Sequence, residues 1–228
     1  MRIGILVAGH VPDEMIGKYG DYDHIFSQFL ADPQLTFKAY PVVDGVFPEN
    51  LDEADGWLIT GSKYGAYEPH PWIPPLEDLI RKIYEARMPL IGVCFGHQII
   101  AQALGGRVEK FGGGWIAGPC KIERDDIGGE QQILAWHQDQ VTKKPDAAEV
   151  VGSSPGCEFA ILRYGPNVLT YQAHPEFTPD FIKDLAEARQ GLLPPEMEAN
   201  VASSEPSTDR AALAKEIKHH WLDHQPVS

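Results

Sequence analysis

Short apolar runs alternate with amphipathic segments through the first half of the chain. The apolar runs have the length of strands and cover residues 2–8, 35–43, 55–60 and 89–93. Between them, apolar residues recur every three or four positions, as on one face of a helix, over residues 22–30, 76–88 and 97–104. This alternation predicts an α/β fold of the flavodoxin-like kind, a mostly parallel sheet flanked by helices.

Three stretches in the first half of the chain show neither the strand pattern nor the helix pattern. Residues 10–14 are predicted to form a loop, and residues 51–54 a short turn or helix. Residues 69–75 contain four prolines, which removes backbone donors and predicts irregular structure before the helix at residue 76.

The second half has a different character. Residues 107–173 contain short extended runs separated by Gly, Pro and Asp, at residues 107–111, 116–123, 131–136, 149–152, 158–163 and 167–173. They predict a small antiparallel β extension that returns to the main sheet at its last run. A helix is predicted over residues 181–188, an exposed loop rich in Pro, Ser and Glu over 190–208, and a C-terminal helix over 209–224.

Composition narrows the class of protein. The 228 residues show no repeat and no linker, so residues 1–228 are predicted to form a single domain. The net charge of −14 argues against binding to nucleic acid or to an anionic membrane. Every apolar run is shorter than a membrane span, and the one at the N-terminus is interpreted as a strand rather than a signal peptide. Three cysteines without framework spacing predict a reducing, cytoplasmic location.

The segment Pro89–Gln98 holds the first candidate chemistry. Its apolar run ends at Cys94, and Gly92 and Gly96 lie two residues to either side, as at a strand-to-helix elbow that carries a nucleophile. The helix that follows would place Cys94 at its N-terminus, where the helix dipole favours a thiolate. The alternative is a buried, inert cysteine, which is common for this residue type.

A thiol nucleophile needs a base and a group that orients the base, and His174-Pro-Glu176 offers both. Residues two apart in an extended chain point to the same side, so Glu176 can reach one ring nitrogen of His174 while the other faces Cys94. A lone His-x-Glu is a weak signal among nine histidines. Its place after a predicted strand, 80 residues beyond the elbow, makes it much stronger.

Together, Gly92-Val-Cys-Phe-Gly-His-Gln98 and Ala173-His-Pro-Glu-Phe177 resemble the class I glutamine amidotransferases, in particular the stand-alone group similar to GMP synthase and the related γ-glutamyl peptidases. The resemblance covers about residues 1–190. It implies that Cys94 is the nucleophile, His174 the general acid and base, and Glu176 the residue that orients His174. It implies neither a metal nor a cofactor.

Two further elements follow from the resemblance. The backbone N–H groups of Gly61 and Phe95 would form an oxyanion hole, although Thr60-Gly-Ser62 stands where the family usually has Gly-Gly-Pro. The segment Ala135–Val141 matches a family element that holds the amino-acid end of glutamine. Its candidate substrate-binding residues, with one from the helix after the elbow, are Gln98, Gln138 and Asp139.

The resemblance implies a small-molecule substrate and leaves three functions open. The first is a thiol amidohydrolase that acts on glutamine or a γ-glutamyl compound. The second is a glutaminase subunit that supplies ammonia to a separate synthetase, since the chain has no adenylation motif of its own. The third is a catalytically silent binding protein of this fold, against which the intact Cys94, His174 and Glu176 argue.

Overall fold

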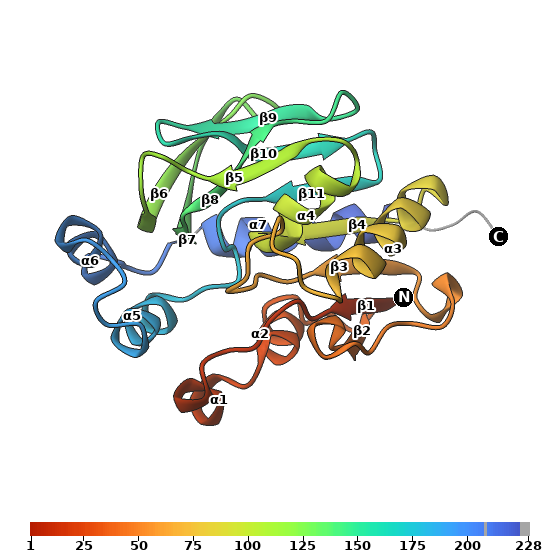
Figure 1. Cartoon of the computed structure of the whole chain (residues 1–228), viewed down its shortest axis with the longest axis horizontal. Helices are drawn as coiled ribbons and strands as arrows, with labels where there is room; N and C mark the ends of the chain where they lie inside the picture. Colours follow the sequence, from red (N-terminus) through yellow and green to blue (C-terminus); the bar gives the residue numbers. More distant parts are fainter. Residues whose placement is uncertain (208, 224–228) are drawn as a thin grey trace.

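The computed structural model describes residues 1–207 and 209–223, and within them nine strands form one mixed sheet (Figure 1). In order across the sheet they are β2 (Thr36–Tyr40), β1 (Arg2–Leu6), β3 (Gly56–Ile59), β4 (Leu90–Val93), β11 (Val168–Tyr171), β10 (Cys157–Tyr164), β9 (Glu149–Ser154), β6 (Ile116–Arg124) and β7 (Gly129–His137). Two more strands, β5 (Arg107–Lys110) and β8 (Asp139–Lys143), pair with each other outside this sheet.

The sheet changes character at β11. From β2 to β11 all neighbours are parallel, and from β11 to β7 all are antiparallel. Ile91 of β4 lies opposite Leu58 of β3 and Leu169 of β11, and these three side chains are buried. All four residues of β4 are buried, as expected of a parallel strand covered on both faces. The predicted parallel sheet with an antiparallel extension is confirmed, and the extension continues the main sheet.

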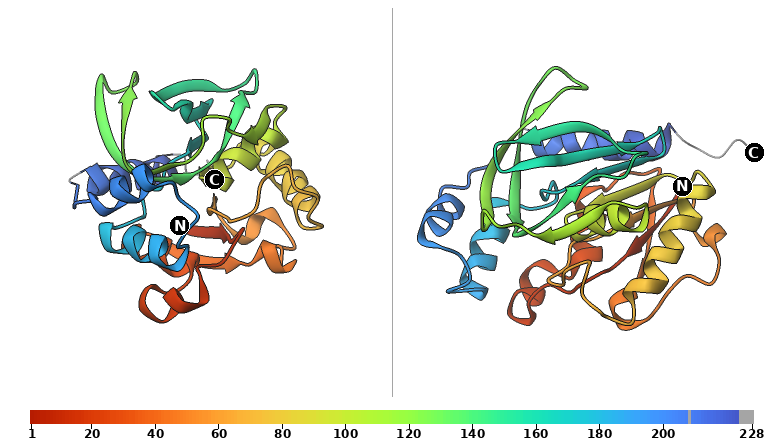
Figure 2. Two further views of the ribbon diagram at one scale, coloured as in Figure 1. Left: turned by 60° about the vertical axis from the view of Figure 1, so that its left-hand side comes forward. Right: turned by 45° about the horizontal axis from the view of Figure 1, so that its top comes forward.

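Helices cover both faces of the parallel half (Figure 2). One face packs against α3 (Ile73–Glu85) and α4 (Phe95–Ala103), and the other against α2 (Tyr22–Phe29) and α7 (Asp209–Leu222), where Trp221 is fully buried. The helices are α1 (Asp13–Tyr19), α2 (Tyr22–Phe29), α3 (Ile73–Glu85), α4 (Phe95–Ala103), α5 (Pro179–Ala188), α6 (Pro195–Ala202) and α7 (Asp209–Leu222), with 3₁₀ turns at Val42–Asp44 and Leu51–Glu53. No helix in the described ranges is both long and apolar enough to cross a bilayer.

The structure corrects the prediction in the first half at two places. A short helix, α1, begins at Asp13, inside the predicted loop. The helix α3 begins at Ile73 rather than Leu76, because Pro74 and Pro75 lie in its first turn. Prolines are tolerated there, since the backbone N–H groups they lack would have no partner within the helix.

The stretch 190–208 is not only an exposed loop. It contains the helix α6, whose Val201 is buried, and the Asn200 side chain donates a hydrogen bond to the Ala117 carbonyl of β6 at 2.6 Å. The polar sequence of this segment predicts a loop. The helix forms because it contacts a distant strand, which the local sequence does not indicate. The predicted C-terminal helix is described from Asp209 to Leu222, and residue 224 lies outside the described residues.

Candidate active site

The chain turns sharply at Cys94, between β4 and α4. Cys94 has φ 52° and ψ −103°, a backbone conformation that residues with a Cβ rarely adopt. The helix α4 begins at the next residue, and Cys94 is almost fully buried. Strain of this kind is typical of a nucleophile held at an elbow.

Gly92 and Gly96 allow the turn to pack closely. A Cβ on Gly96 would lie 2.3 Å from the carbonyl oxygen of Ile59, and one on Gly92 would lie 2.7 Å from the carbonyl oxygen of Gly96. Both distances are far below van der Waals contact, so the elbow requires glycine at these two positions.

The first testable prediction follows from this packing. Gly96→Ala should destabilise the protein by about 3 kcal/mol, because the added methyl group meets backbone atoms that cannot move aside. Urea-induced unfolding measures the effect. Gly112→Ala is the matched control, since Gly112 is exposed and a Cβ there would have no atom within 4 Å. Equal stability of the two variants would contradict the close packing.

His174 and Glu176 form a buried pair after β11. The Nδ1 atom of His174 lies 2.7 Å from Oε1 of Glu176, and both side chains are buried. The ring of Phe177 stacks on the imidazole with centroids 3.9 Å apart. These contacts fix both the position and the orientation of the imidazole.

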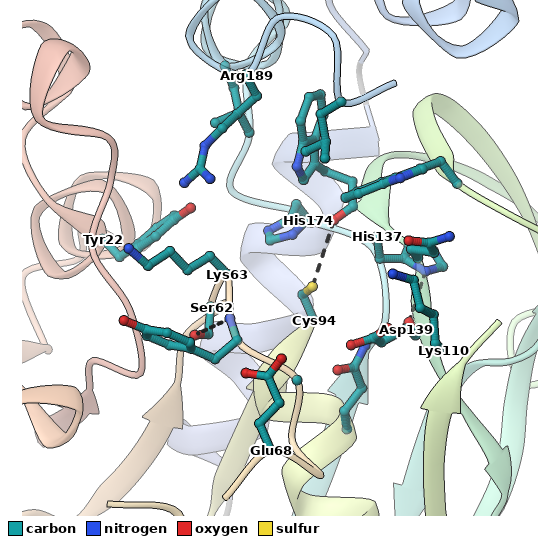
Figure 3. Close-up of a pocket in the computed structure, with 18 of the residues that line it drawn as sticks. Tyr22, Ser62, Lys63, Glu68, Cys94, Lys110, His137, Asp139, His174 and Arg189 are labelled. Atoms are coloured by element: carbon teal, nitrogen blue, oxygen red, sulfur yellow. Dashed lines mark hydrogen bonds between the residues drawn. The ribbon is translucent and has the colours of Figure 1, made fainter. Parts of the chain in front are cut away.

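The topology places this pair beside Cys94. Strand β11 is the parallel neighbour of β4, with Tyr171 opposite Val93, and the Cys94 N–H donates to the Tyr171 carbonyl at 2.8 Å. Residues that follow parallel neighbours emerge at the same edge of the sheet. Figure 3 shows the Cys94 sulfur and the His174 ring facing one cavity.

The charge state of His174 depends on its neighbours. Burial alone would lower its pKa, but the negative charges of Glu176 and of the Cys94 thiolate raise the pKa to about 10. The imidazole is therefore protonated near neutral pH when Cys94 is a thiolate. A thiolate beside an imidazolium is the arrangement of an activated cysteine nucleophile.

The two residues predicted for the oxyanion hole both lie next to Cys94 but come from different segments of the chain. Gly61 follows β3, and a Cβ there would lie 2.9 Å from Cε1 of His174. Phe95 is the first residue of α4. Among the described residues, neither N–H donates to a backbone or side-chain acceptor, and the two residues adjoin Ser62 and Cys94, which line the cavity. Ser62 holds this turn by accepting a hydrogen bond from the Tyr64 N–H at 3.1 Å.

The predicted substrate-binding residues differ in whether their side chains are already engaged in hydrogen bonds within the protein. Gln98 is buried, and its amide donates to the Asp139 carbonyl at 2.8 Å and to Oε1 of Gln172 at 3.1 Å. It therefore positions the β7–β8 turn. Gln138 lies in that turn and Asp139 is the first residue of β8, and both line the cavity, as does Gln98. Burial raises the pKa of the Asp139 carboxyl, while its hydrogen bond with Tyr67 and the charge of Lys110 oppose the rise.

The cavity measures about 290 Å³ and includes residues that no motif indicated. They come from segments far apart in sequence, namely Tyr22, Glu68, Lys110, Trp115 and Arg189. Behind the cavity, Arg210 of α7 donates to the carbonyl of Glu176 at 3.0 Å and to that of Phe177 at 3.2 Å. Only their arrangement in space reveals these residues.

The chain is similar to known proteins in both sequence and fold. The family model described as glutamine amidotransferase class-I matches residues 33–184. γ-Glutamyl peptidase 4 of Arabidopsis thaliana is 32% identical over 77% of this chain and 76% of its own. A component of the glutamine-hydrolyzing GMP synthase of Archaeoglobus fulgidus is 30% identical over 71% of this chain and 87% of its own.

The fold is shared with a solved glutamine amidotransferase from Methylobacillus flagellatus. It aligns with a TM-score of 0.76 at 18% identity, over 100% of this chain and 96% of its own. The matched span contains the elbow and the buried His174–Glu176 pair. The chain therefore belongs to the class-I glutamine amidotransferase family.

Proposed function

We propose that the protein is a thiol-dependent amidohydrolase that cleaves the γ-amide of glutamine or of a γ-glutamyl compound. The observation that carries the proposal is the position of Cys94, in a strained elbow at the edge of the sheet where His174 and Glu176 form their buried pair. A catalytically silent protein would have no need of this strain or of a buried ion pair.

The reaction proceeds in two steps. The Cys94 thiolate attacks the γ-carbonyl carbon, and the resulting oxyanion accepts hydrogen bonds from the N–H groups of Gly61 and Phe95. His174 donates its proton to the leaving nitrogen as the C–N bond breaks, which leaves a γ-glutamyl thioester. Water then attacks the thioester and gives a proton to His174, which releases glutamate and restores the thiolate.

The polarity of the cavity supports a γ-glutamyl substrate. Such a substrate carries an α-ammonium group, and the half-buried carboxylate of Asp139 faces the cavity. Lys110 lies close enough to influence the Asp139 carboxyl and can approach the substrate's α-carboxylate. Gln98 holds the turn that presents Asp139.

A second function, glutaminase activity that feeds a separate synthetase, is favoured by the likeness to the GMP synthase component. The two functions differ in the leaving group, which is ammonia in the glutaminase and an amine in the peptidase. Purified protein should be incubated with glutamine and with a panel of γ-glutamyl amides, and glutamate release followed by mass spectrometry. Turnover that needs an added synthetase would favour the glutaminase, and no turnover of any compound would overturn the proposal.

A second testable prediction concerns Asp139. Asp139→Asn should weaken kcat/KM for γ-glutamyl substrates about 30-fold or more, because a partly desolvated ammonium loses its counter-charge. N-acetylating the substrate should harm the wild type heavily and this variant little. Asp146→Asn is the control, since Asp146 is exposed and outside the cavity. If acetylation harms both proteins equally, Asp139 does not bind the ammonium.

A further inference from the structure

The cavity has two acids and the cation Lys110 on one side of Cys94 and two cations on the other. Asp139 and Glu68 lie on one side of Cys94, and Arg189 and Lys63 lie on the other (Figure 3). If the ammonium of a substrate meets Asp139 and its scissile amide meets Cys94, the side of the cavity that holds Arg189 is left for the leaving group.

Arg189 is available for a ligand. It is the C-terminal capping residue of α5 and is half-buried, and its guanidinium points into the cavity in Figure 3. In the ranges 1–207 and 209–223 it makes no ion pair, although the chain has 33 acidic and only 19 basic residues. An unpaired guanidinium in such an acidic protein suits an anionic ligand, since its donors match a carboxylate in a bidentate manner.

Tyr22 places a hydroxyl between Arg189 and the catalytic residues. Burial raises the pKa of Tyr22, the negative charges of Glu176 and Cys94 raise it further, and Arg189 opposes them. The hydroxyl is therefore within electrostatic reach of all three groups and stays protonated at neutral pH. In Figure 3 it points toward the same space as the guanidinium.

An apolar wall completes this side of the cavity. Trp115 and Trp136 form an edge-to-face pair with centroids 5.9 Å apart, and Leu185 and Leu192 line the cavity on the helix α5 and just after it. Leu192 is 44% exposed, so it offers apolar surface to a ligand in the cavity. The wall adjoins the guanidinium, so one ligand can contact both.

We propose that Arg189, with the Tyr22 hydroxyl, binds a carboxylate on the leaving part of the substrate, so that the preferred substrates are γ-glutamyl amino acids with apolar side chains. Glutamine itself has no group that reaches Arg189, because its leaving group is ammonia. This inference rests on the proposed function, since it takes Cys94 as the point of attack.

The experiment compares γ-glutamyl-leucine with γ-glutamyl-leucinamide, which lacks only the terminal charge. In the wild type the acid should have the higher kcat/KM, by about tenfold or more, and Arg189→Met should remove that preference while changing turnover of the amide little. Lys183→Met is the matched control, because Lys183 is a cation of the same helix that lines a different cavity. It should keep the preference.

Binding measurements on protein that lacks the nucleophile test this inference independently of the proposed function. Calorimetry with Cys94→Ala protein should show tighter binding of the acid than of the amide, and Cys94→Ala with Arg189→Met should show none of this difference. If no compound is turned over but the Arg189-dependent difference in binding persists, the proposed function fails and the carboxylate site stands. Equal binding of acid and amide, no binding of either, or a preference that survives Arg189→Met overturns the carboxylate site.

Discussion

Replacing Cys94 with alanine is expected to abolish hydrolysis of the preferred γ-glutamyl amide. Loss of the nucleophile in a hydrolytic triad costs on the order of 10⁶ in kcat. The strained elbow, the helix that begins at Phe95 and the facing His174 all act on the Cys94 sulfur, so removing it leaves them without a group to activate. Glutamate release measured by mass spectrometry gives the result directly.

Cys120→Ala and Cys157→Ala are the matched controls and should retain activity. Burial raises the pKa of both thiols, that of Cys157 to about 12, so neither is a thiolate near neutral pH. Both lie in the antiparallel half of the sheet, on β6 and β10. Turnover by Cys94→Ala, or its loss in either control, would show that the nucleophile lies elsewhere.

The elbow could be predicted because its signal is local. A buried strand, a cysteine between two glycines and an amphipathic helix are adjacent in sequence, and each obeys a rule of its own. The pairing of His174 with Glu176 was also local, since the two residues are two positions apart. That both follow neighbouring parallel strands depended on the fold class, which the alternation of strands and helices indicated.

Other features depend on contacts between distant segments. The helix α6 packs on β6 through Asn200, and nothing in its own sequence indicates that contact. Arg189 reaches the cavity because α5 ends beside it, and Arg210 meets the carbonyl of Glu176 because α7 crosses behind β11. A single arginine belongs to no periodic pattern and no motif, so only the tertiary structure shows that it lines the cavity.

His174→Ala should nearly abolish activity. Glu176→Gln should retain ten- to a hundredfold more activity than His174→Ala. In hydrolytic triads, loss of the base costs on the order of 10⁶ in kcat and loss of the acid roughly 10⁴. In the proposed mechanism His174 transfers the protons, while Glu176 orients and charges the imidazole through the 2.7 Å contact. The measurement is kcat/KM for both variants on one γ-glutamyl amide. Equal losses would show that the pair acts as a structural unit outside the reaction.

The stability of Glu176→Gln as a function of pH separates these two roles. In the wild type, burial would lower the pKa of His174, but Glu176 and Cys94 raise it to about 10, above the ordinary value of 6.5. The protonated imidazole therefore stabilises the fold fully below about pH 6.5, and this stabilisation is lost as pH rises through about 10. Glu176→Gln should be less stable by on the order of 3 kcal/mol at low pH, because a buried charge loses its partner.

The deficit should shrink as pH rises toward about 10, where the wild-type imidazole also loses its proton. Urea-induced unfolding of both proteins across this range measures it, with Glu158→Gln as a control, since Glu158 is an exposed glutamate on β10. A deficit that is constant or grows with pH would show that Glu176 acts through packing alone. A deficit that falls with pH, together with residual turnover, is expected only if Glu176 holds the charge on His174.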